Sequence, residues 1–80
     1  MKTKLRIKKK LLKALGQRVK FLRTSAKVSQ ESLAFQIGVD RTYIGAIEQG
    51  LRSPSIYCLY MLSKSLGITL KDLAEFSIEE

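Results

Sequence analysis

Residues 39–50 (VDRTYIGAIEQG) hold the side chains best suited to chemistry in this chain. Ile44 and Ile47 are three residues apart and face inward on a short helix, which leaves Arg41 and small or polar residues on its outer side. A helix with a slim, polar outer side fits the DNA major groove, which is about 12 Å wide and shows a distinct hydrogen-bond pattern at each base pair. Near the helix N-terminus, Arg41 can reach guanine O6 and N7 together, a contact worth about 1–3 kcal/mol of discrimination. Residues 39–50 therefore predict a helix that reads DNA. For Arg41, the alternatives to a base contact are a phosphate contact and a solvated surface position.

Positive charge is concentrated at the start of the chain. The net charge is +8, and residues 1–27 carry eleven of the fifteen cationic side chains and no acidic one. Residues 28–80 carry four basic and seven acidic residues. A positive N-terminal third on a mildly acidic body indicates an anionic partner, and nucleic acid and an anionic membrane surface both fit. The alternative is a solvated basic tail that only aids solubility.

The apolar residues that position this stretch follow helical rather than strand periodicity, which predicts an all-α domain of five helices. An apolar stripe from Leu11 to Leu22 indicates a first helix from about Lys9 to Ala26. The basic residues 1–10 are an N-terminal extension, which either forms an arm that follows DNA or lengthens the first helix.

The second and third helices are separated by a very short turn. Ser29 is a good N-cap for the second helix, and Gly38 ends it. Only Val39 and Asp40 precede the third helix, which has Asp40 as its cap and Gly50 as its end. Two short helices joined so tightly are the signature of a helix-turn-helix.

Two further helices complete the domain. Ser53 is the expected cap of the fourth, with Pro54 at its first position and Gly67 at its end. Residues 69–72 (TLKD) resemble a capping box that opens the fifth.

The fourth and fifth helices carry more apolar residues than the core of a small domain needs, so we expect a dimerisation surface there. The alternative is that these residues fill the core of the monomer. The apolar residues concerned are Tyr57, Cys58, Tyr60, Met61, Leu70, Leu73, Phe76 and Ile78. Residues 11–76 thus form the expected DNA-binding domain, and residues 77–80 an acidic tail.

Composition argues against several other functions. One Cys and no His exclude a disulfide scaffold, a Cys/His zinc site and a Ser–His or Cys–His triad within one chain. Carboxylates are not clustered, so we expect no enzyme activity, no metal and no cofactor. No apolar run approaches the roughly 20 residues of a membrane span, and no signal-peptide core follows the basic start. We therefore expect a cytoplasmic protein.

The constellation of residues resembles the Cro/repressor-type (Xre-like) helix-turn-helix family from about Leu15 to Leu73. Residues 40–44 are further similar to controller proteins of restriction–modification systems, although other regulators of the family share that string. Members often have Gly where this chain has Lys27, so we expect Lys27 in a left-handed conformation. The matching residues are Arg23, the run Ser29-Gln30-Glu31-x-Leu33-Ala34, Gly38, and the run Ile44-x-x-Ile47-Glu48-x-Gly50.

The resemblance extends the set of expected DNA contacts. Gln30 starts the second helix, whose N-terminus attracts phosphate, and the family uses a Gln there as a clamp. Tyr43 reaches a phosphate or a base, or packs at the edge of the domain. Gly45, together with Ala46, either lets the helix sit deep in the groove or relieves packing against the second helix. The expected DNA-binding residues are Gln30, Arg41, Thr42, Tyr43, Ala46, Arg52 and Ser53. The resemblance also implies a structural ion pair between Arg23 and Glu48.

The function these features predict is a sequence-specific transcriptional regulator. We expect a homodimer that binds double-stranded DNA at a near-palindromic operator through residues 41–49, as a controller protein or a phage or plasmid repressor does. RNA polymerase or the product of an adjacent gene is a further possible partner. The alternative is a DNA-binding antitoxin that also masks a toxin. A membrane-surface function is disfavoured, because the basic segment has no Trp and few aromatic residues.

Overall fold

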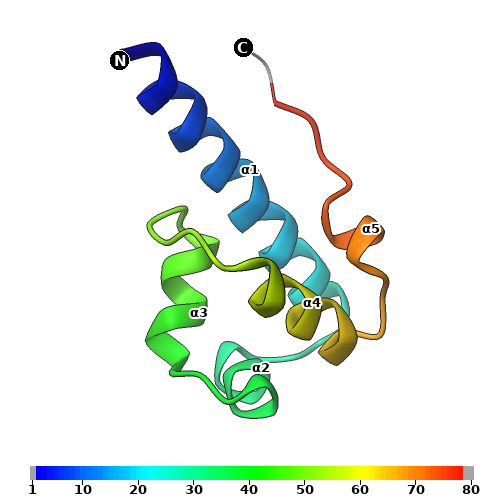
Figure 1. Cartoon of the computed structure of the whole chain (residues 1–80). Coiled ribbons are helices and arrows are strands. Elements are labelled where there is room, and N and C mark those ends of the chain that lie inside the picture. The colour runs from blue at the N-terminus through cyan, green and yellow to red at the C-terminus, as the bar shows by residue number, and fades with distance from the viewer. Residues whose placement is uncertain (1, 79–80) are drawn as a thin grey trace.

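The computed structural model describes residues 2–78 and shows an all-α domain (Figure 1), as the periodicity predicts. Its five helices surround one core, and no strand occurs within the described range. Residues 79–80 of the expected acidic tail lie outside that range. Among residues 2–78, no helix combines the length and apolar content needed to cross a bilayer. The helices are α1 (Lys2–Ser25), α2 (Gln30–Ile37), α3 (Arg41–Glu48), α4 (Ile56–Ser65) and α5 (Leu70–Leu73).

The core lies where the inward faces of the helices meet. α3 packs against both α1 and α2, α4 covers α2, and α5 closes the core against α4 and α1. Both isoleucines of α3 are fully buried, as their spacing predicts. The third helix is therefore held from behind, and its outer side is left free. The buried apolar residues are Leu15, Val19, Leu33, Ala34, Ile44, Ile47, Leu62 and Leu73.

The first helix begins at Lys2, seven residues before the expected start near Lys9. The basic residues therefore lengthen the first helix and do not form a separate arm. No Pro or Gly interrupts residues 2–15, so nothing in the local sequence breaks the helix. Figure 1 shows the N-terminal turns of α1 extending past the connection between α3 and α4.

Two left-handed residues set the turns on either side of α2. Lys27 has φ 59°, which confirms the expectation for this non-Gly position. Gly38 has φ 75°, and the N–H of Val39 bonds the carbonyl of Ala34 at 2.9 Å. These turns place the N-termini of α2 and α3 close together.

The cap expected from Asp40 is only partly present. Asp40 occupies the N-cap position with an extended backbone, but its side chain makes no capping hydrogen bond. The N–H of Tyr43, which a capping carboxylate would normally bond, instead donates to the carbonyl of Asp40 at 3.0 Å. Since that donor is already satisfied, the Asp40 carboxylate remains exposed.

The start expected for the fourth helix is wrong by two residues. α4 begins at Ile56 and its cap is Ser55, whose hydroxyl accepts from the N–H of Cys58 at 3.0 Å. Ser53 and Pro54 lie in the loop before it. Both serines have the side chain of a good N-cap, so the local sequence does not decide between them.

The capping box expected at residues 69–72 is present. The Thr69 hydroxyl accepts from the N–H of Asp72 at 3.0 Å, and Asp72 Oδ2 accepts from the N–H of Thr69 at 3.2 Å. The backbone N–H of Thr69, followed by its hydroxyl, holds the pKa of the Asp72 carboxyl below its ordinary value. A group with a lowered pKa stabilises the folded state above its unfolded pKa and ceases to do so as the pH falls through its folded pKa.

We expect Thr69→Ala to lower the free energy of unfolding by about 1 kcal/mol, the usual contribution of an N-cap side chain. The contribution of Asp72 should disappear in acid, so the difference between wild type and Asp72→Asn should shrink below about pH 4. Urea titrations at pH 6 and pH 3 measure both effects. A difference between wild type and Asp72→Asn that is equal at the two pH values would contradict the box.

Candidate nucleic-acid interface

The first residues of α2 and α3 lie side by side and begin a polar network. Arg41 Nη1 donates to Gln30 Oε1 at 3.4 Å, and Gln30 Nε2 donates to Glu48 Oε1 at 2.9 Å. Glu48 in turn binds Arg23 of α1. Four side chains from three helices are therefore linked, from the exposed Arg41 to the buried Arg23.

The ion pair implied by the resemblance lies at the inner end of this network. Arg23 Nε donates to Glu48 Oε2 at 2.6 Å and Arg23 Nη2 donates to Glu48 Oε1 at 3.1 Å, so the pair is bidentate. The side chains are 11% and 3% exposed. Arg23 Nη1 also donates to the carbonyl of Val28 at 2.8 Å. The pair thus connects α1, the α1–α2 turn and the end of α3, and it holds α3 at a set angle.

Gln30 has a role that the sequence did not indicate. The sequence predicts a phosphate clamp at the start of α2, with a generic polar residue of the first turn as the alternative. Its amide oxygen accepts from Arg41 while its amide nitrogen donates to Glu48. The amide is thereby oriented, with the nitrogen directed inward and the oxygen toward Arg41. The assignment of amide atoms follows from these two partners.

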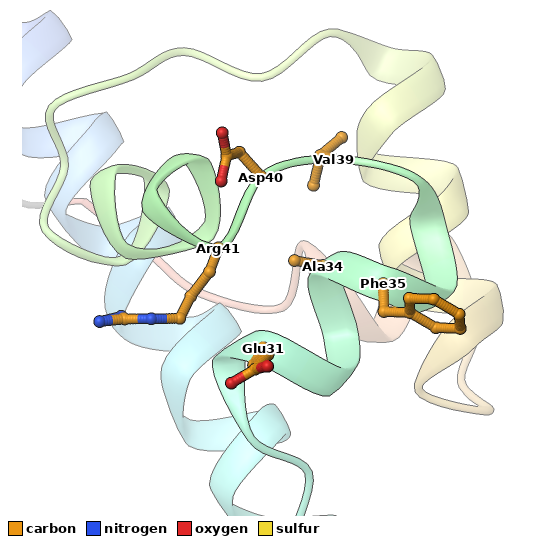
Figure 2. Close-up of a pocket in the computed structure, with 6 residues that line it drawn as sticks. All are labelled: Glu31, Ala34, Phe35, Val39, Asp40 and Arg41. Atoms are coloured by element: carbon orange, nitrogen blue, oxygen red, sulfur yellow. The ribbon is translucent and has the colours of Figure 1, made fainter.

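Arg41 stands at the rim of a shallow hollow between α2 and α3. Figure 2 shows its guanidinium extending outward on the side of Glu31, with Asp40 on the opposite side of the helix start. Phe35, which also lines the hollow, points away from Arg41 and is 87% exposed. Thr42 is exposed and Ala46 is half-buried. The outer side of α3 therefore carries one long cation among short side chains, the arrangement that the major groove accepts.

Tyr43 lies on the edge of the domain rather than on the outer side of α3. Its ring is half-buried against the core and lies 5.2 Å from the Arg52 guanidinium carbon, a cation–π distance. Burial, followed by the proximity of Cys58, raises the pKa of the Tyr43 hydroxyl. Burial also raises the pKa of the Cys58 thiol. Tyr43 thus contacts Arg52 of the loop that follows α3.

Ser53 is exposed in the same loop, but it does not stand at a helix N-terminus. The free N–H groups that would have helped it to hold a phosphate belong to α4, which Ser55 caps. The expected contact of Ser53 with DNA therefore stays a prediction, and only the exposure of its side chain supports it.

Two glycines differ sharply in their surroundings. A Cβ at Gly45 would lie 3.8 Å from Gln30 Oε1, an ordinary contact, so packing against α2 does not require Gly there. A Cβ at Gly16, by contrast, would lie 2.4 Å from the carbonyl oxygen of Ile47. Gly16 lets α1 touch the backbone of α3, a requirement that sequence analysis missed because a mid-helix Gly has no periodicity signal.

The apolar surface expected on the last helices is only partly exposed. Leu73 is 1% exposed and belongs to the core, so its inclusion in a dimerisation surface is wrong. Leu73 is the last residue of a single-turn helix, and this turn directs it inward. Ile56 and Tyr57 at the start of α4 are each 69% exposed, and Tyr60, one turn further, is 51% exposed. The outer side of α4 therefore carries apolar area that the monomer does not cover.

Comparison with known proteins places the chain among regulators. A helix-turn-helix family model matches residues 19–73. Control protein C.BamHI of Bacillus amyloliquefaciens is 44% identical over 63 residues, which is 78% of each chain. Control protein C.MunI of a Mycoplasma species is 48% identical over 59 residues, 72% of this chain and 80% of that protein. The crystal structure of the restriction–modification controller protein C.AhdI of Aeromonas hydrophila superimposes with a TM-score of 0.75, at 42% identity, over 78% of this chain and 94% of that one.

Proposed function

Because the chain belongs to the helix-turn-helix family of DNA-binding transcriptional regulators, we propose that it is a sequence-specific regulator that binds its operator as a homodimer. The observation that carries the proposal is the outer side of α3, where Arg41 projects among short side chains while both isoleucines are buried. The similarity to controller proteins supports control of a restriction–modification system as its task. Regulation of transcription also supports a cytoplasmic location.

The roles of the contact residues follow from their positions. Arg41 reads a base, because its side chain is exposed at the start of α3 and its hydrogen bond to Gln30 restrains its direction. Thr42 and Ala46 adjoin the bases, whereas Gln30, Arg52 and Ser53 contact phosphates. Tyr43 acts through Arg52, against which its ring lies. The contacts of α3 with bases thus specify sequence, and the contacts with phosphates position the protein.

Dimerisation is supported by the exposed apolar side of α4. A single helix-turn-helix contacts only a few base pairs, and two copies related by a twofold axis read half-sites about 34 Å apart. Ile56, Tyr57 and Tyr60 supply apolar area that a second copy would remove from water.

The test is selection from a random duplex library with wild type and Arg41→Ala in parallel. We expect wild type to enrich a near-palindrome, and Arg41→Ala to lose preference at one base pair in each half-site, at a cost of about 1–3 kcal/mol per contact. Lys71→Ala, at an exposed position of α5, is the matched control and should leave the enriched sequence unchanged. Binding without enrichment by wild type would refute sequence-specific reading. Enrichment of a single half-site would refute the dimer.

A further inference from the structure

We propose that a basic stripe on α1, formed by Arg6, Lys9 and Lys13, binds the DNA phosphate backbone outside the segment that α3 reads. This proposal rests on the proposed function and extends it: the first turns of α1 would be a second, sequence-independent contact surface. The partner is the same duplex DNA, and the surface recognises its phosphate charge.

The three cations lie on one side of the helix. They are three and four residues apart, the spacing that brings side chains onto the same face of an α-helix. All three side chains are exposed. Between residues 2 and 78, the ion pairs are those of Arg18 with Glu75 and Arg23 with Glu48, so no carboxylate of the described chain neutralises the stripe.

The stripe is continuous with the surface expected to touch DNA. Gly50, which follows α3, packs directly on the backbone of Lys13: a Cβ there would lie 3.2 Å from Lys13 Cα. Exposed Arg52 stands two residues beyond Gly50. Cationic groups therefore continue from the α3–α4 connection onto the side of α1 that meets it.

The length of α1 gives the stripe its reach. From Lys13 to Arg6 the helix rises roughly 10 Å at about 1.5 Å per residue. Phosphates along one DNA strand are about 3.4 Å apart along the helix axis, so this span matches up to three of them. Figure 1 shows the N-terminal turns of α1 projecting past the connection between α3 and α4, with no other helix beside them.

The charge pattern favours phosphate over an apolar partner. Leu5 is exposed beside the stripe and lines a shallow hollow together with Arg6, Lys9 and Lys10, so cations outnumber the apolar side chain there. Each Lys or Arg that neutralises a phosphate releases counterions, so the logarithm of the binding constant falls with the logarithm of salt concentration by about 0.9 per contact. The stripe therefore predicts a steeper salt dependence than the contacts of α2, α3 and the loop alone produce.

The test compares wild type with Arg6→Gln/Lys9→Gln/Lys13→Gln on a duplex that carries the selected operator and flanking DNA. The control is Lys4→Gln/Lys64→Gln/Lys71→Gln, which removes the same charge from exposed positions off the stripe. Because each of the two protomers loses up to three phosphate contacts, we expect the stripe variant to reduce the slope of the logarithm of the binding constant against the logarithm of salt concentration by up to about 5. It should keep the enriched sequence and lose hydroxyl-radical protection beside each half-site. The control variant should keep the wild-type salt dependence of binding and the wild-type hydroxyl-radical footprint. Circular dichroism melting checks that both variants fold.

Equal slopes for the two variants would overturn the proposal, because net charge alone would then explain the salt dependence. An unchanged footprint would overturn it as well. Wild-type binding to phosphatidylglycerol vesicles that the stripe variant loses, with no change in the DNA slope, would assign the stripe to a membrane instead. Failure of the proposed function is distinct: wild type would then enrich no sequence, whatever the slope.

Discussion

Gly16→Ala should lower the free energy of unfolding by about 3 kcal/mol, the upper end of the usual cost of overpacking. The added methyl would lie 2.4 Å from the Ile47 carbonyl oxygen and 2.6 Å from that of Glu48. These are backbone atoms in the last turn of α3, so no flexible side chain can move aside. α1 and α3 would have to separate, and the core between them would open.

This loss of about 3 kcal/mol is a large part of the total free energy of unfolding. A domain of 80 residues is stable by about 4–12 kcal/mol, at 0.05–0.15 kcal/mol per residue. The matched control is Gly45→Ala, where a Cβ meets only ordinary contacts, and Ala should stabilise α3 by up to about 1 kcal/mol through helix propensity. Thermal melting of both variants measures these changes in stability. A Gly16→Ala protein that melts with or above wild type would show that the two helices do not meet as closely as described.

Glu48→Ala should cost about 3–5 kcal/mol, the range found when one partner of a buried ion pair is removed. Arg23 would be left 11% exposed at its side chain with only the carbonyl of Val28 as a partner. Gln30 would also lose the acceptor for its amide nitrogen. The matched control is Glu75→Ala, whose exposed pair with Arg18 at 3.7 Å should contribute less than about 1 kcal/mol.

A second variant separates stability from recognition. Arg23→Met/Glu48→Leu replaces the pair by apolar side chains of similar size, a change that is often neutral or stabilising. If Glu48 also orients Gln30, this variant should regain stability but bind the operator more weakly than wild type, because Gln30 no longer holds Arg41. Urea denaturation and operator titration measure the two effects. Glu48→Ala with wild-type stability would refute the structural role of the pair.

Local sequence signals predicted the helices and their inner sides. Apolar spacing placed Ile44 and Ile47 in the core, and Gly38 and Lys27 were assigned to turns where the backbone is left-handed. Errors occurred where the local sequence allowed two solutions. Both Ser53 and Ser55 can cap α4 by their side-chain type, and the structure has Ser55 as the cap. The start of α1 was equally open, because residues 1–8 carry no cap.

By itself, the sequence determined the family, the five-helix fold and the helix that presents Arg41, since these follow from periodicity, turn residues and motif spacing. Apart from the ion pair of Arg23 with Glu48, which the resemblance implied, the tertiary structure alone decided which distant groups meet. The contact of Gly16 with α3 and the link of Gln30 to both Arg41 and Glu48 join residues far apart in the chain. Such contacts depend on how the helices cross, and packing of the whole core sets that angle.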